Sequence, residues 1–187
     1  MTSLNTKLLK KAYANGAQLV DANYEYIDEL NVFPVPDGDT GTNLKITTSG
    51  AYETIAELET EDLQELSKTF ARGLLMNARG NSGVIFSQIF KGFSSAFAQG
   101  QKEASVTDLI KAFTAAKEFA YRSVATPVEG TILTVIRESS SALGNYIKDN
   151  KDVDKVMKYM VSEAKASLKR TPDLLPVLKE VGVVDSG

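Results

Sequence analysis

Apolar residues recur at helical spacing through almost the whole chain, and this pattern limits the possible fold more than any other feature. From Leu9 to Ile27 they fall three or four positions apart, which predicts a long helix over residues 5–30. Comparable stretches follow, and one of them reaches Ile147. No segment shows the two-residue alternation of a strand, and prolines interrupt the one β-rich stretch, Val32–Val35. The sequence predicts eight helices and no sheet.

The breaks between these stretches carry residues that end and begin helices. Gly100 is placed to end one helix in the left-handed conformation, and Ser105 with Asp108 predicts a capping box that opens the next. Thr171 as N-cap and Pro172 as first helical residue predict a short last helix that a later glycine ends. Short connections favour antiparallel neighbours, so we expect an all-α, eight-helix, up-and-down antiparallel bundle or barrel.

Composition suits an ordinary globular domain. The 187 residues and 43% hydrophobic content fit a single domain with a substantial core. The net charge of −3 and the lack of a dense Lys/Arg stripe argue against a nucleic acid partner. No apolar run is long enough for a membrane span, no secretory leader is written at the start, and cysteine is absent. We therefore expect a cytoplasmic protein.

Two carboxylates, Asp37 and Asp39, stand one residue apart between a proline-stiffened loop and an expected helix start. The chain has no Cys and no His, so the metal that such a cluster suits is a hard cation, above all Mg²⁺. In the alternative interpretation, this is a Pro-Asp-Gly turn whose aspartates cap the next helix. The following residues add hydroxyl groups, an amide and a helix N-terminus, which favour a phosphorylated ligand: Thr40, Thr42 and Asn43.

A second loop has the sequence Arg-Gly-Asn-Ser-Gly and leads directly into a helix. Gly80 and Gly83 flank Asn81 and Ser82, and they allow backbone amides to approach an anion without a Cβ in the way. The loop lacks the Gly-Lys-Ser/Thr ending of a Walker motif, and taken alone it also fits a plain turn between helices. Together with the acidic loop it predicts a phosphate cradle that faces a metal site.

A third loop, Pro127–Thr131, breaks the helical pattern again. Thr131 is expected to cap the next helix or to contact a ligand, whereas Pro127 and Glu129 are expected to serve the structure. If the helices alternate in direction, the loops after the first, third and fifth helices share one end of the bundle. The phenylalanines of the fourth helix and Met157 and Met160 are expected in the core.

Four motifs in this order resemble the N-terminal kinase domain of bacterial fatty acid kinase, which is related to the nucleotide-binding L subunit of dihydroxyacetone kinase. The resemblance spans most of the chain, and four motifs together are far more specific than any one of them. The motifs are residues 30–43, 78–85, 127–134 and 178–187.

This resemblance implies an eight-helix barrel that binds ATP or ADP at one end through two Mg²⁺ ions. Asp37 and Asp39 would be the metal ligands and the catalytic residues, and Asn31 takes the place of a third metal-binding aspartate in the dihydroxyacetone kinase pattern. The resemblance places these other residues at the nucleotide: Thr40, Thr42, Asn43, Gly80, Asn81, Ser82, Gly83, Thr131 and Asp185.

The resemblance further implies that residues 1–187 are one nucleotide-binding kinase domain from the N-terminal part of a longer protein. A separate fatty-acid-binding protein would present the acyl substrate, and any homodimer would form through other domains. We expect phosphorylation of a fatty acid carboxylate, which is already ionised at neutral pH and needs no general base. The alternatives are a dihydroxyacetone (glycerone) kinase-type subunit and a nucleotide-sensing module without turnover.

Overall fold

The computed structural model describes residues 2–146 and 151–187, and within them the chain forms eight helices and one two-residue strand pair. The all-α prediction is confirmed, and only the short strand pair departs from the prediction of no sheet. The predicted end of the sixth helix at Ile147 lies outside the described residues. The helices are α1 (Thr6–Glu29), α2 (Thr40–Glu53), α3 (Leu63–Met76), α4 (Gly80–Ser95), α5 (Val106–Arg122), α6 (Ile132–Tyr146), α7 (Val153–Leu174) and α8 (Pro176–Val181). The strands β1 (Leu4–Asn5) and β2 (Glu103–Ala104) pair antiparallel.

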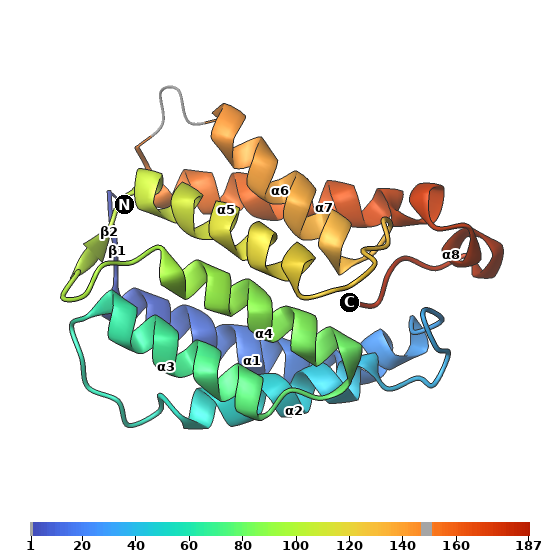
Figure 1. The fold of residues 1–187 in the computed structure, drawn as a ribbon, viewed down its shortest axis with the longest axis horizontal. Coiled ribbons are helices and arrows are strands. Elements are labelled where there is room, and N and C mark those ends of the chain that lie inside the picture. Colours follow the sequence, from blue (N-terminus) through green and yellow to red (C-terminus); the bar gives the residue numbers. More distant parts are fainter. Residues whose placement is uncertain (1, 147–150) are drawn as a thin grey trace.

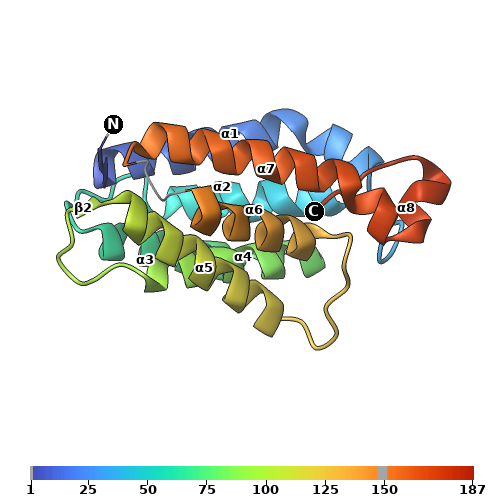
Figure 2. The same cartoon turned by 90° about the horizontal axis from the view of Figure 1, so that it is seen from above.

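Successive helices alternate in direction and pack against each other along their length (Figure 1). The connections after α1, α3 and α5 consequently lie at the same end of the bundle, as predicted. The C-terminal tail after α8 returns to that end as well, at the right of Figure 1, and the view from above shows the same arrangement (Figure 2). We call this the loop end. None of the described helices combines the length and the apolar character needed to cross a membrane.

The core is apolar and rich in aromatic rings. Tyr13 of α1 stacks on Phe70 of α3 with ring centroids 4.0 Å apart, and Phe90 and Phe93 of α4 continue the cluster toward α5. Phe93 of α4 and Phe97 just beyond its end are buried, and Phe86 and Phe90 of α4 are partly buried and pack against this core. The prediction that the α4 phenylalanines form core is confirmed.

The last two helices divide differently from the prediction. α7 continues through Pro172 to Leu174, and α8 begins at Pro176, so Thr171 is an internal residue of α7 and does not cap α8. Pro172 has no amide to donate to the Leu168 carbonyl oxygen. The Thr171 hydroxyl donates to that oxygen instead, at 2.8 Å, which explains how the helix passes the proline.

The helix ends around β2 agree with the prediction in part. The capping box of Ser105 and Asp108 is present at the start of α5. Gly100 does not cap α4, because α4 ends at Ser95. Gly100 has a φ of +77° in the following turn, where its amide donates to Asp62 at 2.8 Å. Glycine is needed there for a turn between helices and not for a helix end.

Candidate functional site

A cavity of about 420 Å³ opens at the loop end, among segments that are far apart in the sequence. Its walls come from the α1–α2 loop, the first turn of α4, the α5–α6 loop with the start of α6, and the C-terminal tail. Four of the predicted site residues line it: Asn81, Ser82, Thr131 and Asp185. These residues come from three of the four predicted motifs. Phe33 and Pro34, which also line the cavity, belong to the remaining one, so all four motifs meet there.

Asn31 holds the acidic loop against the start of α2. Its side chain is buried, and its carboxamide oxygen accepts from the Thr40 hydroxyl at 2.8 Å and from the amides of Asp39 and Thr40, both at 3.2 Å. Its nitrogen donates to the Val35 carbonyl oxygen at 3.0 Å. Both polar atoms of the Asn31 side chain thus form hydrogen bonds that hold the loop in shape. Its predicted part in metal binding stays a prediction.

Asp28 performs the other capping task at the start of α2. This α1 side chain accepts from the Thr42 amide at 3.0 Å and from the Thr42 hydroxyl at 2.7 Å. The contact is possible because α1 and α2 approach closely: a Cβ on Gly41 would lie 1.9 Å from the Tyr24 carbonyl oxygen. The predicted nucleotide-binding hydroxyls of Thr40 and Thr42 are therefore both engaged inside the protein.

Asp37 and Asp39 do not cap α2. Asp39 is the N-cap residue, but its side chain accepts no capping hydrogen bond, since Asn31 and Asp28 supply the acceptors. Asp37 is exposed, and neither carboxylate has a hydrogen bond or ion pair among the described residues. The turn-capping alternative is wrong for these two side chains, which are left available for a ligand.

A metal ion at this loop would need oxygen ligands from outside the protein. Within residues 2–146 and 151–187, no three acidic, histidine or cysteine side chains lie close enough together to form a metal site. Two hard carboxylates, Asp37 and Asp39, still fit Mg²⁺, which is commonly held by one or two carboxylates, phosphate oxygens and water. The donor set therefore fits Mg²⁺ together with a phosphorylated ligand better than Mg²⁺ alone.

The first turn of α4 presents unclaimed backbone amides. Gly80 has a φ of +61°, and a Cβ there would lie 2.6 Å from the Asn43 Nδ2 atom of α2. Arg79 is the N-cap and provides no side-chain hydrogen bond, and the first amide bonded within the helix is that of Gly83. Among the described residues, the amides of Gly80, Asn81 and Ser82 have no partner, which is the arrangement that binds anions at helix starts.

Gly83 serves the packing of α2 against α4. A Cβ there would lie 2.8 Å from the Thr47 Oγ1 atom. The Thr47 hydroxyl donates to the Asn43 carbonyl oxygen at 2.7 Å and accepts from the Arg79 amide at 3.2 Å, so it ties the two helix starts together. The predicted phosphate contact of Gly83 stays a prediction, and its amide is already bonded to the Arg79 carbonyl oxygen.

Comparison with known proteins identifies the family of this chain. The DAK2 domain family model matches residues 34–187. This chain belongs to the DAK2 domain family. Over 187 residues it is 46% identical to uncharacterized proteins of Staphylococcus epidermidis and Staphylococcus haemolyticus, and 45% identical to one of Staphylococcus aureus. Each match covers 100% of this chain and 34% of the relative, so the chain spans about a third of the length of these relatives.

The tail of this DAK2 domain closes one side of the cavity. Asp185 is buried, and its amide donates to the Thr171 hydroxyl of α7 at 3.1 Å. The Ser186 hydroxyl donates to the Thr40 hydroxyl at 3.3 Å, which links the tail to the start of α2. Burial raises the pKa of the Asp185 carboxyl to about 6, although hydrogen bonds from the amides of Gly187 and Ile132 act in the opposite direction.

The α5–α6 loop supplies the apolar wall of the cavity, through Val124, Ala125, Val128 and the start of α6. Thr131 caps α6, which was one of the two roles predicted for it. Its hydroxyl accepts from the Leu133 amide at 3.3 Å and donates to the Val128 carbonyl oxygen. Sequence reasoning missed this wall and Asp28. The loop has no periodic pattern of apolar residues, so its sequence does not show which side chains are buried. The sequence also does not show that an aspartate within one helix caps the start of another.

Substitution of Asp185 by Asn should change how stability depends on pH. A carboxyl whose pKa is about 6 when folded and near 3.8 when unfolded weakens the fold as the pH rises through that interval. The shift of about two pH units corresponds to ~3 kcal/mol at neutral pH. In urea unfolding, the free energy of unfolding of Asp185→Asn relative to wild type should therefore rise by that order from pH 4 to pH 7.

Asp173→Asn on the exposed side of α7 is the matched control, and its stability relative to wild type should be the same at both pH values. If the curve of Asp185→Asn runs parallel to that of the wild type, the Asp185 carboxyl titrates normally and its burial has no energetic cost.

Proposed function

We propose that this DAK2 domain is the ATP-binding, Mg²⁺-dependent part of a phosphotransferase that converts fatty acids to acyl phosphates. One observation carries the proposal. The starts of α2 and α4 lie side by side at the loop end, as the approach of Gly80 to Asn43 indicates. The turn with the unbonded amides of α4 therefore lies next to the first turn of α2, which directly follows the unpaired carboxylates. This combination suits a phosphate chain with its counter-cation.

The chain's own residues would divide the binding of the nucleotide between them. The amides of Gly80, Asn81 and Ser82 would hold phosphate oxygens, with the α4 dipole in the favourable direction. Asp37 and Asp39, with Asn31 as the third candidate, would hold Mg²⁺. That ion would supply neutralisation of the charge on the phosphate oxygens, and phosphoryl transfer depends mainly on such neutralisation and on positioning.

The cavity beside this phosphate site suits the base. Its volume of about 420 Å³ lies within the usual range for small-molecule pockets, about 300–1,000 Å³. Val124, Val128 and Ile132 offer an apolar wall to a flat ring, and Thr131 and Asp185 add polar groups at the edge. Because the base would fill this cavity, the acyl chain needs a different site, which supports delivery by a fatty-acid-binding protein.

The nature of the acceptor separates this proposal from its main rival. A fatty acid carboxylate is ionised at neutral pH, so a site without His or Cys needs no general base for it. Membership of the DAK2 domain family favours the second candidate, a dihydroxyacetone kinase-type subunit. An alcohol acceptor of that kind needs a base, and a partner chain would have to provide it.

Removing the charge of Asp37 or Asp39 should weaken nucleotide binding and leave the fold intact. Contacts to charged groups contribute about 1.5–3 kcal/mol, so Asp37→Asn and Asp39→Asn should each raise the Kd for Mg·ATP by about tenfold or more. Neither carboxylate has a partner in the described structure, so the free energy of unfolding should stay within ~0.5 kcal/mol. Isothermal titration calorimetry and urea unfolding measure the two effects.

Glu57→Gln removes one exposed negative charge from the connection between α2 and α3 and serves as the control for net charge. Unchanged Mg·ATP affinity in both aspartate variants would remove the metal assignment.

Turnover should depend on a carboxylate acceptor that a carrier delivers. With a fatty-acid-loaded carrier, the longer protein should consume ATP and form acyl phosphate, trapped as the hydroxamate. Residues 1–187 with free fatty acid should bind nucleotide without sustained turnover, because the cavity offers no second apolar site. Faster turnover of dihydroxyacetone than of the loaded fatty acid would favour the rival kinase, and rapid turnover of free fatty acid by residues 1–187 would contradict carrier delivery.

A further inference from the structure

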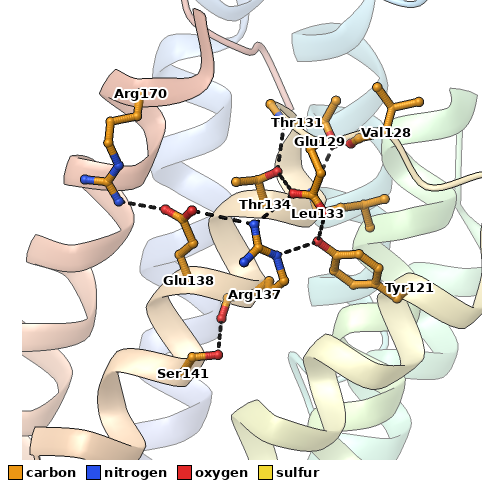
Figure 3. Close-up of polar contacts among 11 residues, drawn as sticks. Tyr121, Val128, Glu129, Thr131, Leu133, Thr134, Arg137, Glu138, Ser141 and Arg170 are labelled. Carbon is orange, nitrogen blue, oxygen red and sulfur yellow. Dashed lines mark hydrogen bonds and ion pairs between the residues drawn. The ribbon is translucent and has the colours of Figure 1, made fainter. Parts of the chain in front are cut away.

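Glu129 was expected to be a structural residue of the α5–α6 loop, and its contacts reveal a specific arrangement. Its Oε1 atom accepts from the Tyr121 hydroxyl of α5 at 2.9 Å. Its Oε2 atom accepts from Arg137 of α6 at 2.9 Å and from the Thr134 hydroxyl. Figure 3 shows these side chains converging on the Glu129 carboxylate. One loop side chain is thereby fixed to two helices at once.

Arg137 extends this network to α7. Its Nε atom donates to the Tyr121 hydroxyl at 3.0 Å, and its guanidinium group lies 3.6 Å from Glu138. Glu138 accepts from Arg170 of α7 at 2.6 Å (Figure 3). Burial would raise the pKa of Glu129, but the hydrogen bonds from Thr134, Arg137 and Tyr121 outweigh it and lower the pKa, which keeps the carboxylate charged.

The residues on either side of Glu129 line the cavity. Val128 and Thr131 are both wall residues, and Gly130 between them has a φ of +83°. Gly130 packs so tightly on the end of α7 that a Cβ would lie 2.7 Å from the Leu175 Cβ atom and 2.9 Å from the Thr171 carbonyl oxygen. The segment 128–131 is consequently held on one side by its backbone against α7 and on the other by the Glu129 carboxylate.

The network restrains the α5–α6 loop more than it stabilises the fold as a whole. The side chains of Arg137 and Glu129 are 40% and 45% exposed, and ion pairs as exposed as this contribute little to folding stability. The restraint instead acts locally, because residues 124–131 lie between α5 and α6 and form no helix that would fix them. A fixed position of the loop residues in the cavity wall is useful if a ligand binds against them.

We propose that the Glu129–Arg137 pair positions the base-binding wall of the nucleotide site. This inference rests on the proposed nucleotide site and extends it: Val128 and Thr131 would contact the base, whereas Glu129 and Arg137 act only through them. The phosphate side of the site is built from α2 and α4 and does not involve this pair. Loss of the pair should therefore weaken binding of a ligand that carries a base and spare a ligand that consists of phosphates alone.

The test compares Mg·ADP with Mg·tripolyphosphate in the full-length protein by calorimetric titration. Glu129→Gln and Arg137→Met should each raise the Kd for Mg·ADP by about tenfold, which is the lower end of the loss found when a residue that orients a metal ligand is removed. The Kd for Mg·tripolyphosphate should change less than about twofold. The double variant should lose no more than the single variants do, because both break one interaction. Arg137→Lys keeps the charge and should restore part of the affinity.

The control is the exposed pair of Glu61 and Lys102, whose charged atoms lie 2.6 Å apart. Glu61→Gln and Lys102→Met should leave both ligands unaffected. Equal weakening of Mg·ADP and Mg·tripolyphosphate, or unchanged Mg·ADP affinity, would overturn the inference while the nucleotide site stands. A wild-type protein that binds neither ligand would instead refute the proposed function, and the inference with it.

Discussion

The amides at the first turns of α2 and α4 are the constraint on which the loop end depends. Every helix start leaves backbone donors that need acceptors. At α2, Asn31 and Asp28 supply these acceptors from within the protein. At α4, no described residue does so, and the positive φ of Gly80 brings this turn up against Asn43. The protein thus supplies side-chain acceptors to the amides of Thr40 and Thr42 at one helix start and, among the described residues, none at its neighbour, and the proposed phosphate site follows from this difference.

The same division explains which acidic residues remain available. Because Asn31 and Asp28 cap α2, Asp37 and Asp39 keep unpaired carboxylates at a position where an aspartate would ordinarily serve as a cap. Leaving two like charges together has a cost unless a cation joins them. Their arrangement is therefore better suited to metal-assisted binding of phosphate than to holding the fold together. Asp185 is a further carboxylate at the loop end, in the wall of the cavity, and its burial raises its pKa.

Much of the fold could be predicted because helical spacing depends on the sequence alone. The capping box at Ser105 and the loops at one end followed from local chemistry and chain order. The prediction was wrong at Thr171 and Pro172, since the buried Thr171 hydroxyl replaces the amide that proline lacks and the helix continues. No local pattern reveals that compensation. The structural role predicted for Glu129 agrees with its contacts, but its partners Tyr121 and Arg137 could not be predicted. The same holds for the contacts of Asn31 and Asp28, because each joins two segments whose spacing the sequence pattern does not give.

In the proposed site, a nucleotide places its phosphates on the first turn of α4. The most direct measurement is a titration of ¹⁵N-labelled protein with Mg·ADP, followed through the backbone amide signals. The signals of the Gly80, Asn81 and Ser82 amides should shift most, with smaller shifts at Ile132 and at the tail. Saturable binding with the largest shifts elsewhere, for example along α1 or α5 away from the loop end, would contradict it.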